Sequence, residues 1–103
     1  MNKIRREQLR KLSEKLSRIA SIDDKAVLEE CVSTLEDIKW DEEDYFDNMP
    51  ENLQGSIRGC ESEDAIDNMY QALDALDEAM ELENEKELLD TINEAIASID
   101  DCV

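Results

Sequence analysis

Apolar residues recur three or four positions apart along almost the whole chain, a spacing that gathers side chains onto one face of an α-helix. The first such stripe consists of Leu9, Leu12, Leu16 and Ile19. The chain holds only two glycines and one proline, too few for the tight turns that a sheet of short strands needs at each reversal. The sequence therefore predicts an all-α fold.

Capping signals divide the first half of the chain into two helices. A basic amphipathic helix is expected over residues 1–20. Ser21, followed three positions later by Asp24, has the form of a capping box and predicts that a second helix covers residues 22–49. Pro50 ends this helix, because the residue before a proline is biased away from the α region.

The second half begins with a connection over residues 50–60, which holds the proline and both glycines and is expected to contain one helical turn. Ser62 is the expected N-cap of a third helix over residues 62–82. Asn84 starts another capping box, so residues 84–102 form either a separate fourth helix or a kinked continuation of the third.

The stripes of the later helices follow the a and d positions of a heptad, as in left-handed helix packing. Glu42 breaks this pattern at an a position, so either it projects from a widened bundle or the register slips there. The remaining stripe residues are Leu28, Cys31, Leu35, Ile38, Tyr45 and Met49, then Ile66, Met69, Leu73, Leu76 and Met80, then Leu89, Ile92, Ile96, Ile99 and Val103.

We expect one domain over residues 1–103, an antiparallel helical hairpin or bundle of three to four helices with heptad-type packing. Four thin apolar stripes make a modest core for a chain of this length. Pairing with a second copy would enlarge that core, which favours a homodimer.

Charge excludes several classes of partner. The chain has 29 acidic and 11 basic residues, no histidine and a formal charge of −18. The summed field of such a chain repels nucleic acid and anionic membranes, so neither is an expected partner. Residues 1–20 are the exception, with seven basic and two acidic residues. Here we expect Arg6, Arg10, Lys11 and Lys15 to face acidic helices of the same chain or its dimer partner.

Apolar content and cysteine use indicate the compartment. There is no run of eighteen apolar residues and no apolar signal core near the N-terminus, so a cytoplasmic protein is expected, in the host cell if a phage encodes it. Cys31, Cys60 and Cys102 are odd in number and widely spaced, which argues against disulfides and a zinc site. We expect reduced thiols, with Cys31 in the core and Cys60 in the connection.

Catalytic chemistry is poorly supported. Carboxylate pairs three residues apart, such as Glu61/Asp64, Glu78/Glu81 and Glu87/Asp90, resemble those of magnesium-dependent nucleotide pyrophosphohydrolases. However, random placement of 29 acids in 103 residues gives many such pairs. The absence of histidine removes the usual general base for a serine or cysteine nucleophile. The expectation is a chain without enzymatic activity, metal or cofactor.

Aromatic residues cluster beside an acidic run. Trp40, Tyr45 and Phe46 flank and follow residues 41–44, and tyrosine and tryptophan are favoured anchors of protein interfaces. The alternative is that Tyr45 and Phe46 pack the helix end against the connection while Trp40 is half exposed. The residues expected to bind a partner are Asp37, Trp40, Asp41, Glu43, Asp44, Asp47, Glu51, Glu61, Glu63, Asp64 and Asp67.

Residues 40–56, with the sequence WDEEDYFDNMPENLQGS, precede an Asp-, Ala- and Leu-rich helix up to Glu78. This segment resembles small acidic helical proteins of phages and mobile elements of Gram-positive bacteria, most closely over residues 46–55. The resemblance brings no catalytic residues. It implies a context in which small acidic phage proteins act against host defence nucleases or regulate phage replication.

These observations favour a non-enzymatic, phage-type acidic binding protein that blocks a basic, nucleic-acid-binding surface of a host protein, as DNA mimics and anti-CRISPR-like inhibitors do. Clustered carboxylates on rigid helices have spacings comparable with those of a phosphate backbone. The alternatives are a helical assembly or structural interaction module with an acidic face that only keeps the chain soluble, and, third, the pyrophosphohydrolase.

Overall fold

The computed structural model describes residues 2–102, and of Ile22 only the backbone. Every regular element in this range is helical, which confirms the all-α expectation. None of these helices is long and apolar enough to cross a membrane. The elements are α1 (Lys3–Ser17), the 3₁₀ turn η1 (Ile22–Asp24), α2 (Lys25–Asp47), α3 (Glu51–Gln54), α4 (Ile57–Glu81) and α5 (Glu85–Asp100).

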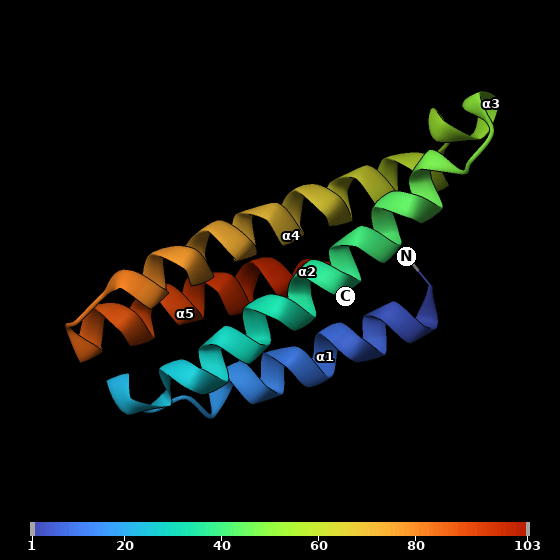
Figure 1. Cartoon of the computed structure of the whole chain (residues 1–103). Coiled ribbons are helices and arrows are strands. Elements are labelled where there is room, and N and C mark those ends of the chain that lie inside the picture. The colour runs from blue at the N-terminus through green and yellow to red at the C-terminus, as the bar shows by residue number, and fades with distance from the viewer. Residues whose placement is uncertain (1, 103) are drawn as a thin grey trace.

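The longer helices run back and forth along one axis, so that helices adjacent in sequence are antiparallel (Figure 1). α4 packs most extensively, against α5 and α2, and α1 packs against α5 and α2 on the other side. The resulting shape is elongated, measuring 47 × 20 × 17 Å.

α2 and α4 are longer than α1 and α5, and together with α3 they extend past them at one end of the molecule (Figure 1). Arg5, in the first turn of α1, reaches Glu42 of α2, and Cys102, just after α5, lies against Ala65 of α4. The end of α2 after residue 42 and the start of α4 before residue 65 therefore lie beside the ends of α1 and α5 and continue past them. We call residues 43–64 the projecting hairpin.

The core follows the stripes only in part. The α1 stripe is buried throughout. On α4 and α5, several expected core residues are only partly buried, because α4 contacts two helices and buries a face wider than a heptad seam. Partly buried are Ile66, Met80, Leu89 and Ile96, while the buried face also includes Ala65, Ala72, Ala79, Leu88 and Ala95. Val103, an expected core position, lies outside the described residues.

The expected start of the second helix is wrong in detail. Residues 22–24 form a 3₁₀ turn, and α2 begins at Lys25. Asp24 does not complete a capping box with Ser21, because its Oδ2 accepts a hydrogen bond from the Ala20 amide at 3.1 Å. The carboxylate thus secures the turn between α1 and α2 rather than the N-terminus of α2.

The start of the third helix also needs correction. α4 begins at Ile57, where the Ser56 side chain accepts a hydrogen bond from the Gly59 amide at 3.3 Å. Ser62, the expected N-cap, lies inside α4. Gly59 does not break the helix; a Cβ there would lie 2.0 Å from the Gln54 carbonyl oxygen, so glycine is what allows α3 to approach α4.

The two other boundary signals agree with the structure. α2 ends at Asp47, shortly before Pro50, and α3 is the helical turn expected in the connection. Asn84 caps α5, accepting a hydrogen bond from the Glu87 amide at 3.1 Å. α5 is therefore a separate helix, since it folds back against α4.

A leucine in the middle of α4 provides a test of the core. Leu76→Ala should lower the free energy of unfolding by about 2–5 kcal/mol, because Leu76 is fully buried and truncation leaves a cavity. Ile57→Ala is the control, because Ile57 is 81% exposed, and it should unfold like the parent. Urea unfolding followed by circular dichroism measures both; equal midpoints for Leu76→Ala and the parent would contradict this packing.

Candidate functional site

The residues expected to bind a partner lie on the surface, with Glu43 half-buried. The structure does not bring all of them together. One group lies on the outer surface of α2 and along its seam with α4. We call this group, extended by a tyrosine of α4, the acidic face: Asp37, Trp40, Asp41, Glu43, Asp44, Asp47, Glu63, Asp67 and Tyr70.

The positions of these residues follow from helical periodicity and from one contact between α2 and α4. On α4, Glu63, Asp67 and Tyr70 are four and three residues apart and share one side of the helix. The Lys39 ammonium of α2 lies 4.1 Å from the centroid of the Tyr70 ring, which joins that side of α4 to α2. Trp40, next in the chain, is 54% exposed on the outer surface of α2.

Lys39 is the cation at this seam. It is 7% exposed, and its Nζ also lies 3.2 Å from Oε1 of Glu43. Burial disfavours its charged form, but the contacts with Tyr70 and Glu43 outweigh burial and raise the pKa of Lys39 above its ordinary value. The positive charge of Lys39 is therefore held between the two helices, beneath the acidic face.

Tyr45 and Phe46 are half-buried and do not belong to this face. The Arg5 guanidinium carbon lies 5.2 Å from the centroid of the Tyr45 ring. The Phe46 carbonyl accepts a hydrogen bond from Nε2 of Gln54 at 3.2 Å, which fixes α3 against the end of α2. These contacts agree with the packing alternative, while Trp40 remains on the surface.

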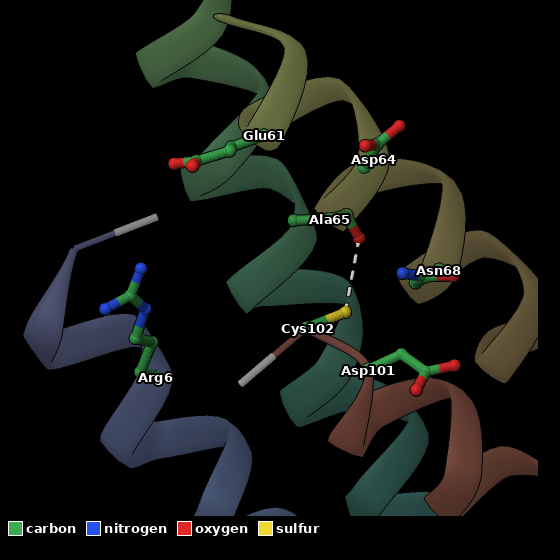
Figure 2. A pocket seen from close by; sticks show the side chains of 7 residues that line it. All are labelled: Arg6, Glu61, Asp64, Ala65, Asn68, Asp101 and Cys102. Atoms are coloured by element: carbon green, nitrogen blue, oxygen red, sulfur yellow. Dashed lines mark hydrogen bonds between the residues drawn. The ribbon is translucent and has the colours of Figure 1, made fainter. Parts of the chain in front are cut away.

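The other expected residues lie elsewhere. Glu51 lies on α3. Glu61 and Asp64 line a recess between α4 and the ends of α1 and α5 (Figure 2). We call it the terminal recess; it is lined by Arg6, Glu61, Asp64, Ala65, Asn68, Asp101 and Cys102.

The terminal recess combines an arginine with carboxylates and a thiol. Cys102 Sγ lies 3.4 Å from the Ala65 carbonyl oxygen, to which it donates (Figure 2). Burial, together with the negative charges of Asp101 and Glu42, raises the pKa of Cys102 to about 12. Within residues 2–102, no group of three or more acidic or cysteine side chains is placed to hold a metal ion.

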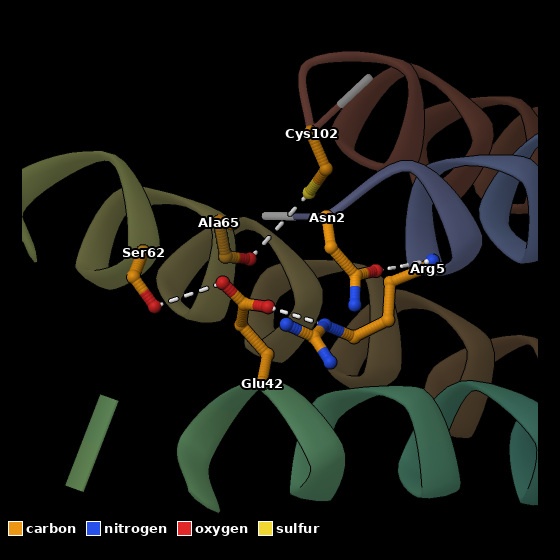
Figure 3. A network of polar contacts seen from close by, with 6 residues as sticks. All are labelled: Asn2, Arg5, Glu42, Ser62, Ala65 and Cys102. Atoms are coloured by element: carbon orange, nitrogen blue, oxygen red, sulfur yellow. Dashed lines mark hydrogen bonds and ion pairs between the residues drawn. The ribbon is translucent and has the colours of Figure 1, made fainter. Parts of the chain in front are cut away.

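The sequence pattern singled out Glu42 but did not predict that its carboxylate is buried. Glu42 is 0% exposed and neither projects from the bundle nor leaves the buried face. Its Oε2 accepts a hydrogen bond from Arg5 Nε at 2.6 Å, and its Oε1 accepts one from the Ser62 hydroxyl at 2.8 Å (Figure 3). The sequence feature that could have predicted it is Arg5, because a cation on the apolar face of its helix requires an acidic partner in the core.

The basic helix meets the acidic helices less often than expected. Lys15 Nζ lies 3.0 Å from Oε2 of Glu30 on α2, as predicted. Arg10 instead pairs with Glu7 of its own helix at 2.6 Å, which corrects the expectation for this residue. Arg6 faces the terminal recess (Figure 2), and Lys11 lies on the exposed outer side of α1.

Removing one partner of the buried ion pair tests its role. Arg5→Ala should lower the free energy of unfolding by about 3–5 kcal/mol, because the Glu42 charge stays buried without its guanidinium. Replacing both residues by methionine should cost much less, because no charge then remains buried. Urea unfolding of both variants measures the difference; the pair has no such role if Arg5→Ala is as stable as the double variant.

Thiol reactivity tests the surroundings of the cysteines. At neutral pH Cys60 should react rapidly with a disulfide reagent because it is exposed, whereas Cys31 and Cys102 should react slowly because burial raises the pKa of both thiols. The release of chromophore over time gives the rates. Cys60→Ser should remove the fast phase, and denaturant should equalise the remaining two. A fast phase that survives Cys60→Ser would contradict this assignment.

The chain was compared with known proteins in three ways. A scan of family models, a search of curated proteins and a search of solved structures gave no match. Its function must therefore be argued from its own residues and contacts.

Proposed function

We propose that the chain is a non-enzymatic acidic binding protein whose acidic face blocks a basic, nucleic-acid-binding surface of another protein. The density of carboxylates along α2 carries this proposal. Between residues 36 and 47 the helix holds six carboxylates besides the buried Glu42: Glu36, Asp37, Asp41, Glu43, Asp44 and Asp47.

The spacing of these charges is close to that of a nucleic-acid strand. At 1.5 Å per residue, this part of α2 is about 17 Å long and carries roughly one carboxylate per 3 Å. One strand of duplex DNA carries a phosphate about every 3.4 Å. A basic groove that holds a phosphate backbone therefore offers complementary charge to α2, and the neighbouring α4 adds a second row of carboxylates.

The rigidity of the support favours the same function. α2 and α4 are packed along their length, so the carboxylates of the acidic face are held by two helices rather than by a loop. Charges held in place lose less conformational freedom on binding than charges on a flexible tail. We propose a heptad-type antiparallel bundle as the scaffold, in the cytoplasm of a host cell and of phage or mobile-element origin.

An assembly module is the second candidate, favoured by the exposed apolar residues of the projecting hairpin. Leu53 and Ile57 are both exposed at the turn between α3 and α4. Two copies that joined these residues would form the homodimer expected from the modest core. In that case the contact would be apolar and would weaken little with ionic strength, whereas charge mimicry would weaken steeply.

A capture experiment distinguishes the two functions. Immobilised protein is incubated with lysate of a Gram-positive bacterium, then washed either with duplex DNA at constant ionic strength or with increasing salt. We expect nucleic-acid-binding proteins to be released by DNA, because DNA competes for their basic surface, and by moderate salt, because salt screens the attraction between the charges. Mass spectrometry identifies them. Proteins that resist both washes would support the assembly module instead.

Charge reversal locates the binding face. Changing Asp37, Asp41, Asp44 and Asp47 to lysine should weaken capture more than tenfold, and it leaves the Lys39–Glu43 pair intact. The matched control reverses four exposed carboxylates at the far end of α4 and in the following loop: Asp77, Glu78, Glu81 and Glu83. Both variants change the net charge equally. Equal loss of capture in the two would refute a localised face.

A further inference from the structure

Trp40 lies on the outer surface of α2 and has acidic residues as neighbours. Its indole is 54% exposed, and the residues three and four positions away on both sides are Glu36, Asp37, Glu43 and Asp44. Side chains at these spacings are neighbours on a helix surface, with about 5–6 Å between Cβ atoms. All four neighbours of Trp40 on the surface of α2 are therefore acidic residues.

The cation nearest in sequence is already bound elsewhere. Lys39 lies over the ring of Tyr70, 4.1 Å from its centroid, and pairs with Glu43. The other aromatic ring that receives a cation is Tyr45, beneath Arg5. Among the described residues, the cation–π contacts are to these two tyrosines, so the exposed indole of Trp40 keeps a face for a cation from outside.

We propose that Trp40 is the anchor for an arginine side chain of the basic partner, stacked on the indole and hydrogen-bonded to the surrounding carboxylates. This inference rests on the proposed function, because it assumes that a basic protein binds the acidic face. It goes further by assigning the chemistry of the contact: a guanidinium, on an arginine-rich rather than a lysine-rich segment.

The reason for arginine lies in the shape of the site. A guanidinium is planar, so it can lie on the indole and still direct its N–H donors sideways, and it is hydrated more weakly than an ammonium. Carboxylates such as Asp37 and Asp44, three residues before and four after Trp40 on α2, can accept those donors in pairs. A lysine ammonium is a point charge that can contact the ring or a carboxylate, but it lacks the planar fork.

Two peptides test this preference: oligoarginine and oligolysine of equal length and charge. The chain contains one tryptophan, so the fluorescence of Trp40 reports directly on what contacts it. We expect oligoarginine to bind roughly threefold to tenfold more tightly and to change the fluorescence more at saturation, because it adds a cation–π contact to the shared charge attraction.

Variants of Trp40 separate ring stacking from charge. Trp40→Leu should remove most of the preference for oligoarginine, measured by calorimetry, because the stacking contact is lost and only the hydrogen bonds to the carboxylates remain. Oligolysine binding should weaken less. Trp40→Phe keeps a ring and should retain part of the preference. Both substitutions lie on the outer surface of α2, and circular dichroism checks that the fold is retained.

The outcomes distinguish this inference from the proposed function. Loss of most of the arginine preference in Trp40→Leu supports the anchor. Equal binding of the two peptides by the parent, or a preference of undiminished size in Trp40→Leu, overturns the anchor and leaves the proposed function standing. If the parent binds neither peptide, or if reversing Asp37, Asp41, Asp44 and Asp47 leaves oligolysine binding unchanged, the acidic face does not recognise basic segments and both fall.

Discussion

The buried ion pair between Glu42 and Arg5 is the interaction on which the arrangement of the helices depends. A carboxylate can be buried only if charge and hydrogen bonds compensate its lost hydration. Arg5 from α1 and Ser62 from α4 supply both to Glu42 of α2, so three helices meet at one side chain. Apolar side chains can pack in several registers of one helix against another. This contact forms only when Arg5, Glu42 and Ser62 of the three helices are brought to the same level. We therefore expect the ion pair to favour this packing over others that would bury similar apolar area.

Besides packing against its neighbours, the short basic helix α1 reduces electrostatic repulsion within this acidic chain. Self-repulsion of a strongly charged chain destabilises its compact state. α1 lies against both α2 and α5, where its cations reduce that repulsion. Lys15 does so through a direct pair with Glu30, and Arg6 does so by facing the carboxylates of the terminal recess. The positive charge is concentrated on one side, which leaves the seam between α2 and α4 strongly negative.

Local signals in the sequence predicted where the helices lie along the chain. They did not predict which side of each helix faces which neighbour. The α1 stripe, the helix end before Pro50 and the cap at Asn84 depend on residues a few positions apart, and the structure agrees with them. Ser62 was misread because its partner is Glu42, twenty residues away, and no local pattern joins them. The site was predictable as a set of exposed acids. Its division between the acidic face and the terminal recess was not, since that depends on which side of α4 meets α2 and which meets α5.

The unequal lengths of the helices divide the molecule into two zones of different local stability. Residues 43–64 form the end of the molecule where α2 and α4 continue past α1 and α5, and most of them are exposed or half-buried, with a smaller buried share than in the middle of the molecule. Segments with low local contact density open more often than the global unfolding reaction occurs. The outer carboxylates of α2 stand on this zone, while Trp40 and Glu42 lie at its base. A partner bound across that boundary would suppress the opening of the projecting hairpin. Binding would then slow amide hydrogen exchange throughout residues 43–64, a segment much larger than the contact itself.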